Sequence, residues 1–240
     1  MTHPDSSLEE IFQDVFRIPD PKNPNRRVIA TKNLTPGRSF YGESLIRVKL
    51  QGSSPELRLW DPYRSKLAAT IINHLEIFPF KAGVSCLYLG ASTGTTVSHI
   101  SDIVGNSGKV FGVEMAPRVA REFLENVVRY RSNIVPIIAD ARHPERYPSI
   151  YGEMSVIYCD IAQPDQTEIA ITNCNHFFNK DAAGILFLVV KASSIDALRP
   201  KNQVFSEQRK ILESSGLVVL EQIDLEPFDR QHAMLVARTN

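Results

Sequence analysis

The sequence has few cysteines, no net charge and no long hydrophobic segment. Its three cysteines, Cys86, Cys159 and Cys174, form no CxxC pair, and two of them lie in short apolar segments. An odd, scattered set of this kind argues against disulfides and a zinc site and favours a reducing compartment. The 27 basic and 27 acidic side chains cancel, which disfavours a protein that binds nucleic acid by charge alone.

The chain also lacks a segment that would place it in or across a membrane. The longest apolar segment, residues 182–190, is far shorter than the ~20 residues of a membrane helix. The first ten residues, MTHPDSSLEE, are polar and acidic, unlike a signal peptide. We therefore expect a soluble, cytoplasmic protein that carries no compartment signal and has no membrane partner.

The composition changes near residue 60, which predicts two domains. Short β-type patterns at 27–31 and 44–50 alternate with turns rich in proline and asparagine, and residues 22–38 include five basic side chains and no acidic one. These features predict a small β-rich N-terminal domain over residues 1–55, with a basic edge. Residues 56–240 form the predicted second domain.

In the second domain, short apolar strands alternate with amphipathic helices, the first helix at 64–75. Strands and helical crossovers in this order require an α/β fold with a mostly parallel sheet covered on both faces. The last two strands are joined by the short linker PFDRQ, so we expect an antiparallel hairpin. The seven predicted strands are 85–89, 109–113, 133–138, 155–159, 183–190, 217–225 and 233–237.

Polar residues follow the strands of this predicted sheet, where α/β folds bind their ligands. The first strand runs into a turn with Gly90 and Gly94, and Glu114, Asp140 and Asp160 end the next three strands. The glycine spacing is not GxGxxG, and no GxxxxGK[ST] motif is present, so phosphate binding is disfavoured. A nucleoside without phosphates fits better, and S-adenosylmethionine is the common one. Alternatively, the glycines serve only the turn.

Four further residues are expected at the same edge of the sheet. Lys66 begins the first helix, Asp160 and Lys191 end strands, and His232 begins the last strand. A lysine that ends a buried strand is costly unless paired or functional. Burial and a second lysine favour the neutral amine that acts as a general base, and Asp160 opposes that effect and orients it. Alternatively, both lysines are solvated, Asp160 caps a turn and His232 is a core histidine.

Long stretches of the chain resemble the fibrillarin family of box C/D guide-RNA-directed 2′-O-ribose methyltransferases, in its compact archaeal form. The resemblance covers the sequence from about Arg17 to the end. The stretches that carry it are ATKNLTPGRSFYGE (30–43), RSKLAATI (64–71), YLGASTGTTVSHISDIVG (88–105), GKVFGVEMAPR (108–118), RSNIVPIIADARHPERY (131–147), YCDIAQPDQTEIAITN (158–173), KASSID (191–196) and HAMLV (232–236).

This resemblance implies a Rossmann-like methyltransferase fold with a seven-stranded sheet, and it implies a catalytic set at Lys66, Asp160, Lys191 and His232. No metal site is expected. Two positions depart from the family pattern: the glycine loop reads GASTGTT instead of GAASGTT, and Met115 replaces a frequent aromatic residue. The residues expected to bind S-adenosylmethionine are Gly90, Ala91, Thr95, Thr96, Glu114, Met115, Asp140, Ala141, Asp160 and Gln163.

The resemblance also implies partners, which would explain how a neutral chain acts on RNA. They are a box C/D guide RNA with its target RNA, a Nop-domain scaffold protein and a kink-turn-binding ribosomal-type protein. The expected activity is methyl transfer to a guide-selected ribose in pre-rRNA or tRNA. Two alternatives stay open at this point: a non-catalytic scaffold, and a different S-adenosylmethionine enzyme that acts on tRNA bases or small molecules.

Overall fold

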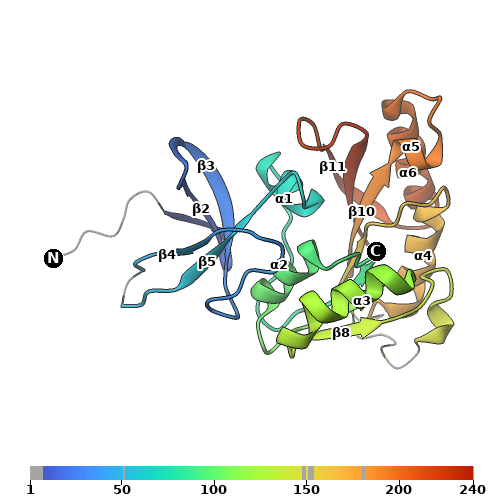
Figure 1. Cartoon of the computed structure of the whole chain (residues 1–240). Coiled ribbons are helices and arrows are strands. Elements are labelled where there is room, and N and C mark those ends of the chain that lie inside the picture. The colour runs from blue at the N-terminus through green and yellow to red at the C-terminus, as the bar shows by residue number, and fades with distance from the viewer. Residues whose placement is uncertain (1–7, 51, 148–149, 151–153, 180–181, 240) are drawn as a thin grey trace.

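The chain folds around two β-sheets that lie side by side (Figure 1). The computed structural model describes residues 8–50, 52–147, 150, 154–179 and 182–239. The smaller sheet is antiparallel throughout and has the strand order β1-β2-β3-β5-β4. Its strands are β1 (Glu9–Phe12), β2 (Val15–Asp20), β3 (Asn23–Lys32), β4 (Leu45–Arg47) and β5 (Glu56–Trp60).

The position of β5 differs from the predicted domain boundary. This strand pairs with both β3 and β4, so the N-terminal sheet extends beyond residue 55, where the sequence pattern placed its end. In the segment ELRLW the side chains of Leu57, Arg58 and Trp60 are buried. The division of the chain into two domains stays a prediction.

The larger sheet has the predicted arrangement of seven strands in the order β11-β12-β10-β9-β6-β7-β8. Strands β6 to β10 pair in parallel, whereas β12 runs antiparallel to both β10 and β11. The predicted α/β fold with a C-terminal antiparallel hairpin is therefore confirmed. The strands are β6 (Ser85–Leu89), β7 (Lys109–Val113), β8 (Ile134–Ile137), β9 (Val156–Cys159), β10 (Ile185–Lys191), β11 (Val218–Asp224) and β12 (His232–Arg238).

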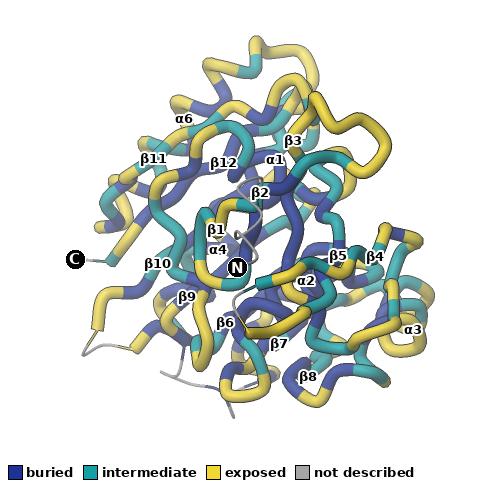
Figure 2. Tube along the Cα trace, turned by 90° about the vertical axis from the view of Figure 1, so that its left-hand side faces the viewer, coloured by how far each residue is buried: buried dark blue, intermediate teal, exposed yellow. Residues whose placement is uncertain are grey.

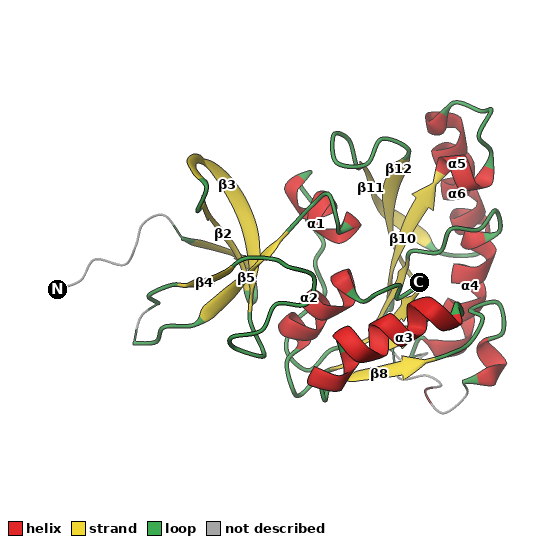
Figure 3. Ribbon diagram, viewed as in Figure 1, coloured by secondary structure: helices red, strands yellow, loops and turns green. Residues whose placement is uncertain are grey.

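Helices cover both faces of this sheet (Figure 3), because side chains along each strand alternate between two apolar cores. Tyr88 of β6 packs in the core of the first three helices, whereas its neighbours Leu87 and Leu89 pack in the other core, with α4 and α6. The helices are α1 (Lys66–Ile72), α2 (Thr95–Val104), α3 (Pro117–Asn126), α4 (Gln166–Phe177), α5 (Ala192–Ile195) and α6 (Lys201–Ser214), with 3-10 turns at Val128–Tyr130 and Pro144–Arg146.

The N-terminal sheet shares one of these cores. Val15, Ile29 and Trp60 pack in the same apolar cluster as α1 and α2. The β2–β3 hairpin is exposed to solvent at its turn (Figure 2). This exposed end includes basic residues of the predicted basic edge, such as Lys22 and Arg26.

Buried charges also join the N-terminal sheet to α2. Arg58 of β5 lies with its Nε 2.9 Å from Asp102 Oδ2 and contacts Glu43, and Arg131 Nη2 lies 2.6 Å from Asp102 Oδ1. The exposed fraction of each of these four side chains is at most 1%. Truncation of one member of such a cluster leaves an unpaired buried charge, which costs roughly 3–5 kcal/mol.

Candidate active site

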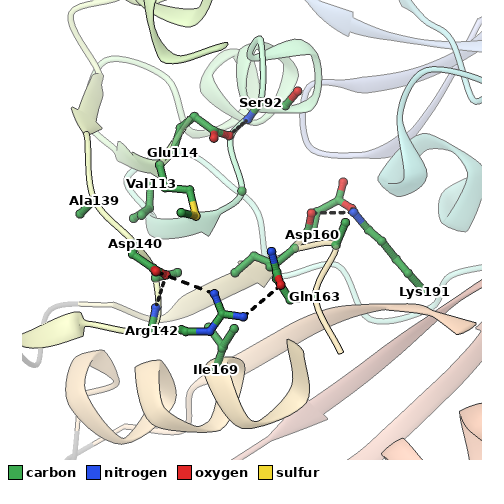
Figure 4. A pocket seen from close by; sticks show the side chains of 15 residues that line it. Ser92, Val113, Glu114, Ala139, Asp140, Arg142, Asp160, Gln163, Ile169 and Lys191 are labelled. Atoms are coloured by element: carbon green, nitrogen blue, oxygen red, sulfur yellow. Dashed lines mark hydrogen bonds and ion pairs between the residues drawn. The ribbon is translucent and has the colours of Figure 1, made fainter. Parts of the chain in front are cut away.

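A cavity of about 290 Å³ opens beyond the carboxyl ends of the parallel strands (Figure 4). Its walls are the segments that follow β6, β7, β8 and β9, together with Lys191 at the end of β10. Seven of the predicted cofactor residues line it: Gly90, Glu114, Met115, Asp140, Ala141, Asp160 and Gln163. The fold therefore brings most of the predicted set to one hollow.

Glu114 presents a fixed carboxylate at the end of β7. Its Oε2 accepts a hydrogen bond from the Ser92 backbone N–H and its Oε1 accepts one from the Ala116 N–H, both 2.9 Å long. These bonds join the turn after β6 to the start of α3. A carboxylate held in this way keeps lone pairs for two adjacent hydroxyl groups, such as those of a ribose.

The two glycines of the turn after β6 have different neighbours. Gly90 has a φ of +82°, and a Cβ atom there would lie 2.9 Å from the Asp160 carbonyl oxygen. Gly94 has a φ of +91°, and its Cβ would lie 2.6 Å from the ring of Phe123 in α3. Both positions favour glycine on backbone grounds. The close neighbour of Gly94 is thus the packed helix α3, whereas that of Gly90 is the Asp160 backbone beside the cavity.

Three predicted cofactor residues lie outside the wall of the cavity. Ala91 is buried, and Thr96 places its hydroxyl 2.9 Å from Ser65 Oγ at the start of α1. Thr95 lines a different hollow of about 250 Å³, together with Tyr41 and Arg64. Cofactor contact by these three residues stays a prediction.

The wall of the cavity includes Arg142, which the sequence analysis missed. Its guanidinium donates 2.7 and 2.9 Å hydrogen bonds to the two carboxylate oxygens of Asp165, and a 3.0 Å bond to Gln163 Oε1. Its backbone N–H donates to Asp140 Oδ1 at 3.0 Å. The forked pair with Asp165 lowers the pKa of that carboxyl group. Arg142 thereby ties the segment after β8 to the segment after β9.

Asp160 lies between two lysines from distant parts of the chain. Lys66 Nζ is 3.3 Å from its Oδ1, and Lys191 Nζ is 2.8 Å from the same oxygen and 2.8 Å from the Asp160 carbonyl oxygen. Burial by itself raises the pKa of Asp160, but the two ammonium groups together hold the pKa below its usual value. Asp160 is therefore ionised at neutral pH.

His232 completes the predicted catalytic set. It lies directly across from Lys191 in the β10–β12 ladder, and its Nδ1 contacts the Asp229 carboxylate. Burial lowers the pKa of His232, and the neighbouring Lys66 and Lys191 add to this effect, whereas Asp229 opposes it. The imidazole is therefore neutral at pH 7.

The four predicted catalytic residues thus meet at the edge of the cavity. Residues 7–240 match the sequence model of the Fibrillarin family. The chain belongs to the fibrillarin family. The family prediction made from the sequence is confirmed.

The relatives cover nearly the whole chain. The fibrillarin-like rRNA/tRNA 2′-O-methyltransferase of Pyrobaculum aerophilum is 48% identical over 211 residues, which span 88% of this chain and 87% of that protein. The structure of Aeropyrum pernix fibrillarin with natively bound S-adenosyl-L-methionine has a TM-score of 0.84 and 41% identity, and covers 99% of this chain and 100% of its own. The structure of a fibrillarin/Nop5p complex has a TM-score of 0.82 and 33% identity, and the match covers 95% of this chain and 99% of that chain.

The predicted catalytic set of this fibrillarin-family chain falls into two pairs. Asp160 and Lys191 line the cavity, whereas Lys66 and His232 do not. We call the part of the site formed by Lys66 and His232 the acceptor side. Within the part of the chain that the structure describes, no cluster of histidine, cysteine and acidic side chains is arranged to hold a metal ion.

Gln166 is a second residue that the sequence analysis missed. Its side chain is fully buried, accepts a 3.0 Å hydrogen bond from the Lys191 backbone N–H through Oε1, and donates a 2.8 Å bond to the Gln163 carbonyl through Nε2. It therefore links the wall of the cavity to the residue that ends β10. The only sequence signal was its place at the start of a helix next to Gln163 and Asp165.

Proposed function

We propose that this chain is an S-adenosylmethionine-dependent RNA 2′-O-ribose methyltransferase that acts on guide-selected positions in rRNA and tRNA. The observation that carries the proposal is the Lys66–Asp160–Lys191 cluster at the rim of the cavity. Family membership supports it, as do relatives named fibrillarin-like rRNA/tRNA 2′-O-methyltransferase.

The residues that line the cavity fit S-adenosylmethionine in their chemistry. Glu114 offers acceptors for the ribose hydroxyls, and Asp140 offers a carboxylate near the expected base. Val113, Ile161 and Ile169 give the cavity apolar walls suited to a purine ring. Met115 is 52% exposed at the edge and offers a thioether in place of an aromatic ring. When bound, the cofactor supplies an electrophilic methyl group on a positively charged sulfur.

The task of the chain is then to hold the acceptor hydroxyl in line with that methyl group and to take its proton. Two lysines share the single carboxylate of Asp160, so loss of a proton from one lysine leaves a balanced ion pair. Lys191 is our candidate for the proton acceptor, because it lines the cavity and its Nζ is fixed by two oxygens of Asp160. Asp160 orients it for that role.

Lys66 and His232 act from the acceptor side in this proposal. The Lys66 ammonium stabilises negative charge as it develops on the ribose oxygen, because its position is set in advance by Asp160. The neutral His232, oriented by Asp229, completes the hydrogen-bond network around the acceptor hydroxyl.

Partners hold the RNA in this proposal. The chain has no net charge, whereas phosphate contacts usually supply much of the affinity of a protein for RNA. The fibrillarin/Nop5p complex supports a Nop-domain scaffold as one partner, and we propose a box C/D guide RNA and a kink-turn-binding protein as the others. The archaeal relatives support a cytoplasmic location. No helix among the described residues is long and apolar enough to cross a membrane.

The test is transfer of labelled methyl from S-adenosylmethionine into an RNA paired with a box C/D guide, with and without the two partner proteins. We expect label on one ribose 2′-oxygen, and only in the complete assembly. Label on a base, or on unpaired RNA with this chain alone, would favour a different methyltransferase. Saturable cofactor binding without any transfer in the complete assembly would favour a scaffold.

A further inference from the structure

A buried contact between two hydroxyl groups joins two helices next to the catalytic set. Ser65 Oγ lies 2.9 Å from Thr96 Oγ1, and the two residues are only 2% and 6% exposed. Ser65 stands directly before α1, and Thr96 is the second residue of α2. The pair therefore links the starts of these two helices.

Ser65 also determines where α1 begins. Its backbone is extended, with a φ of −141°, and its hydroxyl accepts the Ala68 N–H at 3.4 Å, which is the usual role of a helix N-cap. A hydroxyl has one donor and two acceptor sites, so Ser65 can cap the helix and bond Thr96 at the same time. Lys66 is the first residue of α1, so the place of Ser65 sets the place of the Lys66 backbone.

The other partner, Thr96, follows a turn whose backbone is fixed. The Gly90 N–H donates to the Val113 carbonyl at 2.9 Å, and the Ser92 N–H donates to Glu114 Oε2 at 2.9 Å. These bonds tie the turn before α2 to the end of β7, where we expect the ribose of the cofactor. Thr96 thus has a set position relative to the cofactor cavity.

The Thr96 hydroxyl contacts side chains of the chain itself. Thr96 does not line the cofactor cavity. Besides Ser65, its partner is Tyr88 of β6, which is 2% exposed. Burial raises the pKa of Tyr88 well above its ordinary value, and the hydrogen bond to Thr96 opposes this effect. The Thr96 hydroxyl therefore connects the sheet and α2 to the start of α1.

Lys66 depends on this second anchor because Asp160 holds it less closely than it holds Lys191. Lys66 Nζ lies 3.3 Å from Asp160 Oδ1, whereas Lys191 Nζ lies 2.8 Å from the same oxygen. The Lys66 side chain is also more exposed, at 23% against 12%. The ion pair leaves the Lys66 ammonium more freedom, so the position of its backbone matters more.

We propose that Ser65 and Thr96 are positioning residues that hold Lys66 in register with the bound cofactor. Their hydroxyl contact fixes the start of α1 against the turn that binds the cofactor, and Asp160 then directs the Lys66 ammonium. The Thr96 hydroxyl serves Lys66 rather than the cofactor. This proposal rests on the proposed function, because it assigns how one residue of the same site is held.

The first test measures single-turnover methyl transfer in the complete assembly at saturating S-adenosylmethionine. Thr96→Val removes the hydroxyl at nearly constant volume and leaves Ser65 as the cap of α1. We expect its rate to fall roughly tenfold, since small misplacements of a reacting group have large effects. Thr96→Ser keeps the hydroxyl and is expected to stay near the wild-type rate. Calorimetric titration is expected to show unchanged cofactor affinity in both variants.

Ser101→Ala is the matched control. Ser101 is a fully buried serine of the same helix, and its hydroxyl donates a 2.7 Å hydrogen bond to Asn133 Oδ1. Its loss is expected to lower the stability of the fold without affecting the rate. The Ser65→Ala/Thr96→Val double variant is expected to be no slower than Ser65→Ala alone, because the two residues act through one contact.

The second test measures Lys66 itself in the chain without RNA or partners. Trace acetylation by acetic anhydride, followed by mass spectrometry, gives the reactivity of each lysine. We expect Lys66 to react about fivefold faster in Thr96→Val than in the wild type, which corresponds to the loss of one neutral hydrogen bond. Lys66 in Ser101→Ala and in Thr96→Ser is expected to react at the wild-type rate.

Several outcomes would overturn the positioning role. They are a wild-type transfer rate in Thr96→Val, an equal fall in Ser101→Ala, and a lower rate without faster acetylation of Lys66. Weaker cofactor binding with an unchanged rate at saturation would assign the Thr96 hydroxyl to the cofactor instead. Absence of transfer by the wild type would contradict the proposed function, whereas the acetylation of Lys66 would still test the contact.

Discussion

The side-chain amide of Gln166 accepts the backbone N–H of Lys191 at 3.0 Å. The same amide donates to the carbonyl of Gln163, so one buried side chain links a cavity wall to the proposed proton acceptor. Changes that disturb Lys191 are therefore expected to affect turnover, whereas changes that disturb only the cavity wall are expected to affect cofactor binding.

Gln166→Leu is expected to lower turnover about tenfold, because a buried N–H without a partner costs ~1–3 kcal/mol and the Lys191 backbone loses its fixed position. The readout is kcat at saturating S-adenosylmethionine and RNA in the complete assembly. Gln208→Leu is the matched control, because Gln208 is equally buried and bonds Thr167 instead. Equal kcat in the two variants would remove the positioning role of Gln166.

Lys191→Ala is expected to abolish methyl transfer while leaving most of the cofactor affinity in place. The substitution removes the proposed proton acceptor but keeps the carboxylates of Glu114 and Asp140 in the cavity. Transfer in the assembly and calorimetric titration with S-adenosylmethionine measure the two effects. A variant with near-normal turnover would show that the proton goes elsewhere.

Arg142→Ala is expected to weaken cofactor binding about tenfold with little change in kcat at saturation. The guanidinium holds Gln163 and Asp165 in place, and lysine cannot reproduce its forked pair. Arg142→Lys should therefore resemble the alanine variant in a cofactor titration. Full affinity in either variant would mean that the loop after β9 is held by other contacts.

Acid is expected to destabilise the protein through His99. This fully buried ring stacks on Trp60 and contacts the Thr31 and Tyr41 hydroxyls at 2.7 and 2.6 Å. Burial lowers its pKa well below the ordinary 6.5, and the Arg58 guanidinium adds to the effect. Below pH 6.5, His99 is protonated in the unfolded chain but stays neutral in the folded chain. The free energy of unfolding is therefore highest for this group at neutral pH and falls as the pH drops.

The slope of that loss is about 1.4 kcal/mol of unfolding free energy per pH unit below 6.5. Urea unfolding at several pH values between 7.5 and 5 measures it. His99→Gln is expected to be less stable at pH 7 but to lose less on acidification. Parallel curves for the two proteins would mean that His99 is protonated in the folded chain.

The sequence predicted the strands of the larger sheet to within a few residues, because alternating apolar strands and helices leave few ways to bury both faces. It also predicted that Lys66, Asp160, Lys191 and His232 lie close together, because the start of the first helix, the ends of two parallel strands and the start of an antiparallel strand meet at one edge of the sheet. It did not predict Arg142 or Gln166, since their importance lies in hydrogen bonds between loops. Nor did it predict that Ser65 and Thr96 meet, because contact between distant turns leaves no local pattern.

The predicted domain boundary after residue 55 falls within the N-terminal sheet for a related reason. Glu56–Trp60 lies between β3 and β4 in that sheet, yet in the sequence it directly precedes the helix that begins the second half. By its strand pairing, β5 belongs to the N-terminal sheet. By its position in the sequence, it stands next to the first helix of the second half, so the sequence pattern alone assigns it there.

The core shared by Trp60, Ile29 and the helices behind the larger sheet has a practical consequence for anyone who wishes to express the two halves separately. A fragment that begins at residue 56 would carry Trp60 and Arg58 without the strands that cover them, and would be prone to aggregate. Calorimetry of the whole chain is expected to show one heat-absorption peak. The N-terminal sheet thus supplies part of the apolar core that stabilises the second half of the chain.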